Sequence, residues 1–294
     1  MKITLWGTRG SFPSPGPETV RYGGNTPCVQ VEGDDGTMLV LDAGTGIRRL
    51  GTTIGAGAPR IDILLTHLHI DHIQGLAFFD PLYRDGQEIH IWGPASTTLD
   101  LRARLSRYHS PPFFPVRLRD LPCALTLHDV PIGHFAIGQF GITTSRVCHP
   151  GPTVGYRIAA GGASMTYIPD HEPALGARSF PQEPEWTSGF DLAADADLLI
   201  HDAQYTVTEY SQCVGWGHSA IPHTIAFAMA ARVKMLVPFH HDPGHSDEVL
   251  DRLFADARNP RPLRLRFAPG KEGMRFELGE HRRPIVRSHR IIRH

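Results

Sequence analysis

The sequence predicts an α/β fold in which two β-sheets pack together and helices lie outside them. Three observations support this prediction. Short apolar or β-prone runs fill both halves of the chain, stretches with helical features flank them, and no linker divides the halves. With 294 residues, 41% of them hydrophobic, the chain can also bury a large core. Packed layers of strands and helices around one core bury such elements well.

The first third of the chain is expected to form short strands separated by Gly, Pro and Asp. These strands are expected over residues 2–5, 28–31, 38–41 and 61–65. The last of them is short and apolar, which fits a buried strand, and it ends directly before Thr66. We then expect a helix over 72–79 that stops before Pro81. The next elements are a strand over 88–92, a helix over 97–108 and a Pro-rich loop over 111–115.

The rest of the chain continues with strands and then alternates strands with helices. Further strands are expected over 141–147, 154–159 and 164–168. The alternating elements are a strand over 197–201, a helix over 221–231, a strand over 235–239, a helix over 247–258, and closing strands over 263–267 and 275–278. We expect one domain over residues 1–279. Residues 280–294 carry five arginines and few apolar residues, which predicts a solvated basic C-terminal tail, with a phosphate-attracting arm as the alternative.

Charge and composition set limits on location and partners. The formal net charge is -1, so no global field steers the protein toward nucleic acid or an anionic membrane. The four cysteines lie far apart without CxxC spacing, which favours reduced thiols in a cytoplasm over disulfides or a cysteine-only zinc site. The N-terminus turns polar too soon for a signal peptide, and no run reaches the ~18 apolar residues of a membrane helix. The unusual feature is the presence of 18 histidines.

Three of these histidines and one aspartate follow the strand expected over 61–65. The run is Thr66-His67-Leu68-His69-Ile70-Asp71-His72. Histidines two apart on an extended loop can point to one side, and Asp71 and His72 follow where the chain is expected to turn into a helix. Imidazole combined with carboxylate suits zinc, manganese or iron better than calcium or magnesium. We therefore expect a metal site here rather than a surface cluster of histidines.

Four residues cannot complete two metal sites, so further ligands are expected on later segments. Rigid elements place ligands well, and three residues lie where an expected strand ends and a loop begins. They are His149, Asp170 and His240. This shared position favours them over the other histidines.

With these residues, the chain resembles the metallo-β-lactamase-fold hydrolases over nearly its full length. The resemblance rests on Leu41-Asp42-Ala43-Gly44, on the HxHxDH run and on the three later residues in the same order. It implies a four-layer αββα fold with two mixed sheets inside, and two divalent metal ions, for which zinc is expected and manganese or iron are alternatives. It implies one ion held by His67, His69 and His149, a second held by Asp71, His72 and His240, and Asp170 as the bridge. Asp42 resembles an aspartate that orients a ligand from behind.

Several neighbouring side chains are not expected to bind metal. Adjacent side chains on an extended segment face apart, so His171, His241 and Cys148 are expected to point away from the ions. His245 is expected in a surface turn. The remaining histidines without converging partners are taken as structural or exposed: His90, His109, His128, His134 and His223.

A second sequence match indicates which branch of the family the chain resembles. Leu199-Ile200-His201-Asp202-Ala203 and Gly217-His218-Ser219 are similar to paired elements of ribonuclease Z and related phosphodiesterases, although that branch often has glutamate where this chain has Asp202. A histidine held by a carboxylate stays protonated near neutral pH and can supply a proton to a leaving alkoxide. The expected catalytic residues are therefore His218, Asp202 and Asp71. The alternative for His218 is a cap of the helix expected over 221–231.

The charge of the expected site also favours a phosphodiester. Two divalent cations bring four positive charges, and Asp71, Asp170 and a bridging hydroxide remove three, which leaves about +1. Paired metals ~3.5–4 Å apart can stabilise the attacking and the leaving oxygen of an in-line displacement. The bridging aspartate argues against a β-lactamase, because by resemblance the dinuclear lactamases of this fold lack it.

The sequence thus predicts a phosphodiesterase that acts on small, cyclic nucleotide-like substrates through a metal-bridging hydroxide. Structured RNA is less favoured, because ribonuclease Z usually carries a long basic arm that grips tRNA, and the segment near Pro111 is short and not strongly basic. The loops 7–11 and 22–26 resemble those of small cyclic-nucleotide phosphodiesterases, which makes Arg9 and Asn25 candidate substrate-binding residues. Turns that merely join strands are the alternative.

Other functions stay open at this stage. They are a tRNA 3′-processing endoribonuclease, another hydrolase of the fold such as a thioesterase, lactonase or sulfatase, and a non-catalytic metal-binding sensor. A sensor of this kind should have lost ligands, whereas the chain keeps all seven. The oligomeric state is also open, with a homodimer as one option.

Overall fold

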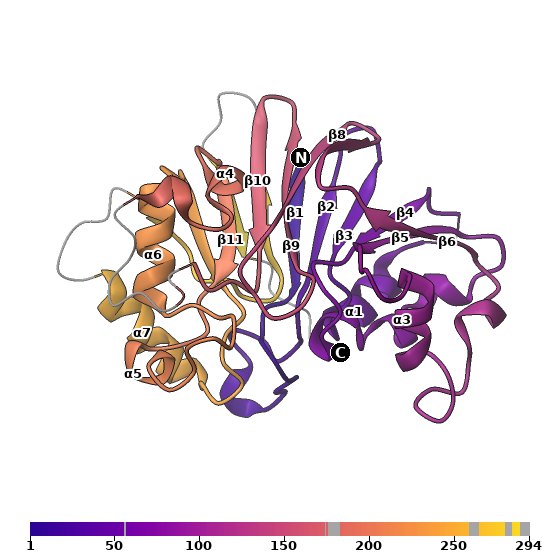
Figure 1. Ribbon diagram of the computed structural model, residues 1–294, viewed down its shortest axis with the longest axis horizontal. Coiled ribbons are helices and arrows are strands. Elements are labelled where there is room, and N and C mark those ends of the chain that lie inside the picture. The colour runs from indigo at the N-terminus through magenta and orange to yellow at the C-terminus, as the bar shows by residue number, and fades with distance from the viewer. Residues whose placement is uncertain (56, 174, 176–182, 259–264, 280–283, 289–294) are drawn as a thin grey trace.

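Two β-sheets pack face to face in the computed structural model, and helices lie on their outer faces (Figure 1). The structure describes residues 1–55, 57–173, 175, 183–258, 265–279 and 284–288. This arrangement confirms the predicted α/β architecture of two packed mixed sheets with helices outside. Among the described residues, no helix combines the length and the apolar character that crossing a bilayer demands.

The first sheet holds eight strands in the order β15-β14-β1-β2-β3-β4-β5-β6. Their bounds are β1 Lys2–Gly7, β2 Cys28–Glu32, β3 Met38–Leu41, β4 Ile61–Leu64, β5 Glu88–Pro94, β6 Ala124–Val130, β14 Met274–Glu277 and β15 Ile285–Ser288. Strands β3 to β6 run parallel, and the other neighbours are antiparallel. Helices α1 (Gly46–Thr53) and α3 (Leu101–Tyr108) cover its outer face through a shared apolar cluster.

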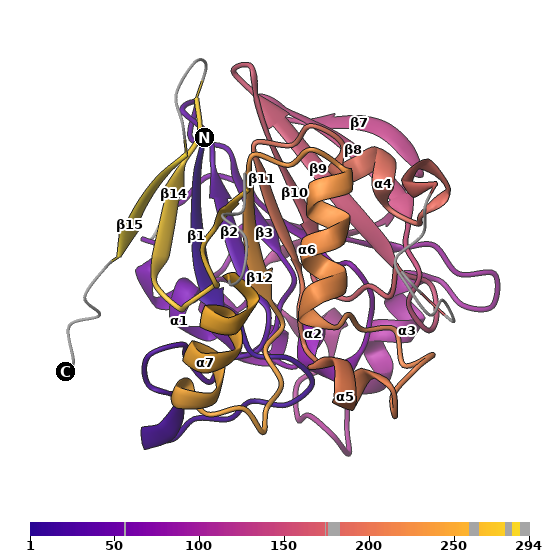
Figure 2. The ribbon, with the colours of Figure 1, turned by 90° about the vertical axis from the view of Figure 1, so that its left-hand side faces the viewer.

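The second sheet holds seven strands in the order β13-β12-β11-β10-β9-β8-β7. Their bounds are β7 Gly133–Ile137, β8 Phe140–Arg146, β9 Val154–Ala160, β10 Ala163–Ile168, β11 Leu198–Asp202, β12 Met235–Phe239 and β13 Arg266–Phe267. Strands β10 to β13 run parallel. On its outer side lie α4 (Phe190–Ala193), α6 (Ile221–Ala230) and α7 (Asp247–Arg258), and Figure 2 shows α6 in front of this sheet. The short α5 (Val207–Tyr210) precedes α6.

The core between the sheets follows from alternation along the strands. In β3, Leu39 and Leu41 belong to the cluster between the two sheets, whereas Val40 belongs to the cluster under the outer helices. Successive side chains of a strand point to opposite faces, so an uninterrupted apolar strand can be buried on both sides. Strand β4 follows the same rule, with Leu64 facing the other sheet and Ile63 facing the helices.

Several element boundaries differ from the sequence predictions. The helix expected over 72–79 is a short α2 (Ile70–Ile73) followed by a 3-10 turn, Leu76–Phe78. Gly75 separates the two, and a Cβ there would lie 2.0 Å from the Gly44 carbonyl oxygen, so the chain is pressed against its neighbour at this point. Helix α3 begins at Leu101 instead of residue 97, because the Asp100 side chain accepts the Ala103 N–H at 2.7 Å and caps it.

Four residues of the C-terminal segment belong to the first sheet. Residues 285–288 of the expected basic tail form β15, which pairs antiparallel with β14. Residues 280–283 and 289–294 of the expected tail lie outside the described residues, as do residues 263 and 264 of the strand expected over 263–267. The domain boundary at residue 279 stays a prediction.

Candidate metal centre

The predicted site residues come together at the ends of strands from both sheets. The HxHxDH run follows β4, and Asp42 follows the neighbouring β3. From the second sheet, the residues after the ends of β8, β10 and β12 are His149, Asp170 and His240. Because β10, β11 and β12 are parallel neighbours, their carboxyl ends share one edge, where a site can be built from separate segments.

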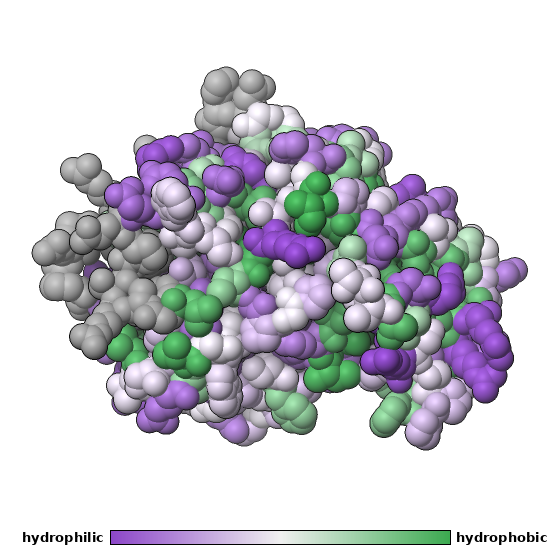
Figure 3. Space-filling model, in the orientation of Figure 1, coloured by the Kyte–Doolittle hydropathy of each residue, from purple (hydrophilic) through white to green (hydrophobic). Residues whose placement is uncertain are grey.

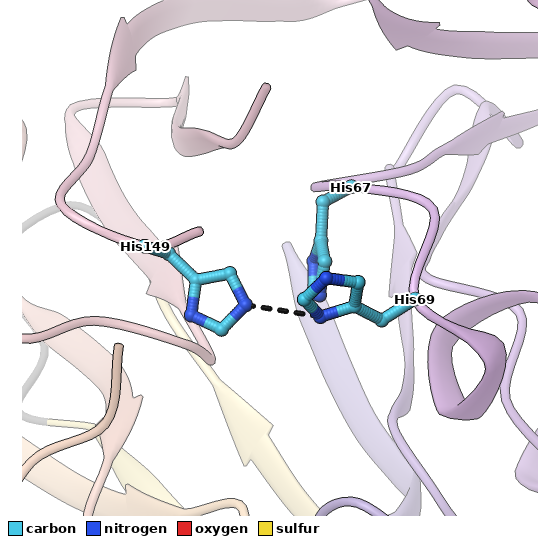
Figure 4. Close-up of side chains that lie close together, drawn as sticks. All are labelled: His67, His69 and His149. Atoms are coloured by element: carbon cyan, nitrogen blue, oxygen red, sulfur yellow. Dashed lines mark hydrogen bonds between the residues drawn. The ribbon is translucent and has the colours of Figure 1, made fainter. Parts of the chain in front are cut away.

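One group of possible ligands is His67, His69 and His149, whose nitrogens lie within 4.8 Å of one another. Figure 4 shows the three rings turned toward one another from two segments, with His149 Nε2 3.1 Å from His69 Nδ1. The other nitrogen of His149, Nδ1, donates to the Gly217 carbonyl at 2.8 Å, which leaves the Nε2 lone pair facing the group. Burial lowers the pKa of His149 to about 4, so its imidazole is neutral, as a metal ligand must be.

A second group is Asp71, His72 and His240. Asp71 Oδ2 lies 3.3 Å from His72 Nε2 and 3.2 Å from His240 Nε2. The Nδ1 atoms of the two histidines contact acceptors outside the group, at 2.8 Å from Asp42 Oδ2 and 2.8 Å from Gln204 Oε1 respectively. Such contacts fix the tautomer and the ring orientation, so that both Nε2 atoms face the same space.

Asp170 lies between the two groups. Its Oδ1 atom is 3.1 Å from His72 Nε2 and 3.3 Å from His240 Nε2. Its Oδ2 atom is 3.7 Å from the Nε2 atoms of His67 and His149. One carboxylate oxygen therefore faces each group, which is the arrangement that a bridging carboxylate needs.

The buried polar atoms of the centre fit divalent cations. His67 Nε2, His72 Nε2 and Asp170 Oδ1 are buried, and none of them makes a hydrogen bond of normal geometry with a described residue, although His72 Nε2 and Asp170 Oδ1 lie 3.1 Å apart. Leaving a buried polar atom without a partner costs ~1–3 kcal/mol, and here three such atoms face a common space. Five imidazoles with carboxylates suit zinc, manganese or iron. The geometry thus fits two divalent metal ions.

Asp42 orients the HxHxDH loop from behind. It is fully buried, and its Oδ1 atom accepts the Thr66 N–H at 2.7 Å. Its Oδ2 atom contacts His72 Nδ1 at 2.8 Å and accepts the Tyr167 hydroxyl at 2.9 Å. Asp42 thus touches the loop, the ring of a proposed ligand and a strand of the second sheet, in keeping with the role that the resemblance implies.

Asp202 and His218 form a pair beside the centre. His218 Nδ1 lies 2.7 Å from Asp202 Oδ2, and the His218 ring stacks on the His240 ring with centroids 4.9 Å apart. Burial lowers the pKa of His218, but the carboxylates of Asp202, Asp170 and Asp71 together outweigh burial and raise this pKa to about 9. The capping alternative for His218 is wrong, because α6 begins after Ala220 with no side-chain cap.

The structure gives Arg9 and Asn25 contacts that join loops, and substrate binding by either residue stays a prediction. Arg9 is fully buried, and its guanidinium donates to the backbone carbonyls of Gly23, Asp242 and His245 at 2.8–3.1 Å. The Asn25 side chain donates to Glu272 Oε2 at 3.0 Å. Both side chains therefore donate hydrogen bonds that join separate segments of the chain.

The neighbouring histidines lie outside the ligand groups, as expected, and His245 is buried instead of exposed in a surface turn. His171 Nδ1 faces His201 Nε2 at 2.9 Å, and His241 Nε2 donates to the Gly270 carbonyl at 2.8 Å. His245 is also buried and contacts Glu209 at 2.9 Å. Each of the three thus has a partner away from the proposed ligands.

Two further residues that sequence reasoning missed position the site. Glu172 accepts the Tyr210 hydroxyl at 2.9 Å and the N–H groups of Gly215 and Gly217 at 2.8–3.1 Å, which shapes the loop before His218. Gln204 holds His240 Nδ1 through its side-chain oxygen. The only signal for either residue is its place two positions after a site residue, which a sequence pattern cannot separate from chance.

The loop before His218 allows a test of how closely the centre is packed. Gly217 has φ +87°, and a Cβ there would lie 2.3 Å from His149 Nδ1. Gly215 has φ +88° but has nothing within 4 Å of its Cβ position. Both alanine variants should lose ~1–3 kcal/mol of unfolding free energy from backbone strain, and only Gly217→Ala should also weaken metal binding. Thermal unfolding and zinc titration of both variants measure this, and equal metal affinities would contradict the packing argument.

A model of the beta-lactamase superfamily domain matches residues 37–241. The chain belongs to the beta-lactamase superfamily. The matched region begins just before β3 and contains every residue of the two possible ligand groups. The superfamily assignment confirms the resemblance inferred from the HxHxDH run and the later residues.

Individual members of the superfamily are similar over nearly the whole chain. Ribonuclease Z of Bradyrhizobium diazoefficiens is 28% identical, over 87% of this chain and 96% of the relative. Among solved structures, the metallo-beta-lactamase fold protein YhfI from Bacillus subtilis has a TM-score of 0.68 at 19% identity, covering 94% of this chain and 99% of the other. Human short-form tRNase Z has a TM-score of 0.63 at 21% identity, with the same coverage. These similarities confirm the metallo-β-lactamase fold.

Proposed function

We propose that this protein is a dinuclear metal-dependent phosphodiesterase. The observation that carries the proposal is the position of Asp170 between two ligand groups, with the Asp202–His218 pair beside them. In this proposal His67, His69 and His149 hold one ion, and Asp71, His72 and His240 hold the other. Zinc is the proposed metal, with manganese and iron as alternatives.

The charge of this centre supports an anionic substrate. When bound, two divalent ions supply Lewis acidity and an activated water. Asp71 and Asp170 offset only part of the positive charge of the ions, so a phosphodiester anion is attracted to the centre. A site of this charge favours an anionic phosphodiester over a neutral ester or lactone.

Asp202 and His218 supply the proton for the leaving oxygen in this proposal. Asp202 is fully buried, and its Oδ1 atom accepts the Gln204 and Ser219 N–H groups at 3.0 Å each. This fixed carboxylate holds His218 by Nδ1, which leaves Nε2 as the nitrogen that can meet a substrate oxygen. Protonation of the leaving oxygen by such a held imidazole is general acid catalysis.

Small phosphodiesters are the proposed substrates, and precursor tRNA is the second candidate. The second candidate is favoured by the similarity to a relative named ribonuclease Z, which extends over 96% of that relative. Both substrates place a phosphodiester in the same centre, so the centre itself does not separate them.

We also propose a cytoplasmic location, which the widely spaced cysteines support. For the assembly we propose a homodimer, and light scattering can measure the oligomeric state.

A substrate panel with metal removal tests the proposal. Purified protein loaded with zinc should hydrolyse bis-p-nitrophenyl phosphate and cyclic nucleotides, and should act little on precursor tRNA. Chelation should abolish the activity, and zinc, manganese or iron should restore it. Elemental analysis should find about two metal ions per chain. Efficient 3′ trimming of precursor tRNA would favour the second candidate, whereas hydrolysis of thioesters, lactones or sulfate esters alone would reject both.

A further inference from the structure

A basic pocket lies beside α3 and contains none of the residues of the metal centre. Its volume is about 420 Å³, which lies within the usual size range of small-molecule sites. The polar side chains that line it come from α3 and from the loop after it: Arg102, Ser106, His109, Ser110, Arg117 and Arg119. Figure 3 shows hydrophilic and apolar residues mixed over the side of the molecule on which α3 lies in Figure 1.

His109 is the buried residue of this pocket, and its ring is unsatisfied. The residue is only 2% exposed, and neither Nδ1 nor Nε2 has a hydrogen-bond partner among the described residues. A neutral imidazole always carries one N–H donor, and buried donors in proteins are nearly always paired. The ring packs against Phe114, with centroids 4.8 Å apart, so apolar contact holds it in place. A ligand oxygen in the pocket would supply the missing partner.

The arginines give the pocket its charge. Arg102 and Arg117 are exposed and form no ion pair with any described residue, and Arg119 meets only Asp120, at 3.6 Å on the surface. The guanidinium group matches the oxygens of a phosphate in shape and charge, and it can bind two of them at once. Three arginines with one carboxylate among them favour an anionic ligand.

The loop beside the pocket adds an exposed aromatic surface. Phe113 is 77% exposed, and its N–H donates to the carbonyl of the pocket residue Ser110 at 3.0 Å. Exposed aromatic rings next to arginines are the usual surface for stacking a nucleobase while its phosphate is held. The end of α3 and this loop also contact the segment that follows the HxHxDH run: Tyr108 donates to the Gln74 carbonyl at 2.8 Å, and the ring centroids of Phe78 and Phe114 lie 5.8 Å apart.

We propose that this pocket binds the phosphate of a nucleotide. Arg102 and Arg117 contact the phosphate oxygens, His109 donates to one of them from below, and Phe113 offers its ring to the base. Two sources carry this ligand chemistry: a free mononucleotide, or a nucleotide within a longer substrate whose scissile phosphate lies at the metal centre.

Calorimetric titration of the zinc-loaded protein with AMP and with inorganic phosphate tests the pocket. The Arg102→Gln/Arg117→Gln double variant should bind AMP at least ~10-fold more weakly, because each guanidinium contributes charge and directed donors. Arg107→Gln is the matched control, since Arg107 is exposed on the same helix and does not line the pocket. The loss should persist in an Asp170→Ala background, where binding at the metal centre no longer contributes.

A second variant tests the buried histidine. His109→Phe keeps an aromatic ring of similar size and removes both nitrogens, so it should weaken AMP binding ~10-fold while thermal stability holds or rises. Wild-type protein that binds neither AMP nor phosphate would overturn the proposal, as would an equal loss in Arg107→Gln. Neither result bears on whether the metal centre hydrolyses phosphodiesters.

Kinetics of the same variants identify the source of the nucleotide. The double variant can change the kinetics of one substrate only. A higher KM for single-stranded oligoribonucleotides with unchanged hydrolysis of bis-p-nitrophenyl phosphate would show that the bound nucleotide is part of the substrate chain. The slope of log KM against log salt concentration should then fall by about 0.7, because the contact with one phosphate is lost. Weaker AMP binding with an unchanged KM for oligoribonucleotides would instead assign the pocket to a free nucleotide.

Discussion

Replacing Asp170 with alanine should remove both metal ions together and abolish turnover. The reason is geometric, because one oxygen of this carboxylate faces each ligand group, at 3.1–3.7 Å from four Nε2 atoms. Without it, five imidazoles would have to share two dications with only the Asp71 carboxylate. Elemental analysis should find the metal content reduced from about two ions to well below one. Activity should fall by at least ~10⁴-fold, since a metal-activated water and charge stabilisation are both lost.

Two further variants serve as controls for this prediction. His69→Ala removes an exposed member of the first group only, so the protein should lose one ion and keep the other. Asp195→Ala removes an exposed aspartate whose partner is Arg232 on the surface, and it should change neither metal content nor activity. An Asp170→Ala protein that keeps one ion at full strength would show that Asp170 serves a single site.

His218→Ala should lower turnover by ~10²–10⁴-fold while the metal content is unchanged. The His218 ring lies beside the centre, stacked on the His240 ring, and Nδ1 is held by Asp202 at 2.7 Å. If His218 gives a proton to the leaving oxygen, the loss depends on the leaving group. It should be largest for alkyl phosphodiesters, and it should shrink for p-nitrophenyl esters, whose phenolate leaves without a proton.

The comparison of leaving groups distinguishes proton donation by His218 from a purely structural role. Asp202→Asn should show the same pattern in weaker form, because it keeps the shape of the side chain and loses the charge that holds His218. Equal losses for alkyl and p-nitrophenyl substrates would argue against proton donation. Loss of metal in His218→Ala would make His218 a ligand or a structural support instead.

The strands and the proposed ligands could be predicted because their signals are local. The run after β4 packs four possible ligands into six residues, and Asp170 and His240 each follow an apolar strand at the point where it ends. The structure brings all seven proposed ligands together, although metal binding by each of them stays a prediction. The fold followed from the same information, since alternation and short apolar runs indicate strands wherever they occur.

The features that sequence reasoning missed depend on contacts between distant segments. Arg9 was predicted to contact substrate. The carbonyls that accept its hydrogen bonds belong to Gly23, Asp242 and His245, as far as 236 positions away, and the sequence does not show this. Helix α1 begins with Gly46, contains Gly51 and has no side-chain cap, so it lacks the propensity and capping signals of a helix. The role of Glu172 likewise depends on backbone N–H groups that only the folded loop presents.

The proposed ligand groups have one more consequence, because each of them draws on both sheets. His67 and His69 come from the first sheet and His149 from the second, while Asp71 and His72 join His240 in the same way. Each bound cation would therefore link the two sheets. Ions that bind only the folded chain stabilise it by mass action, by ~2.7 kcal/mol for one site at a hundred times its Kd. The melting temperature of this protein should then rise with the free concentration of the metal that it binds.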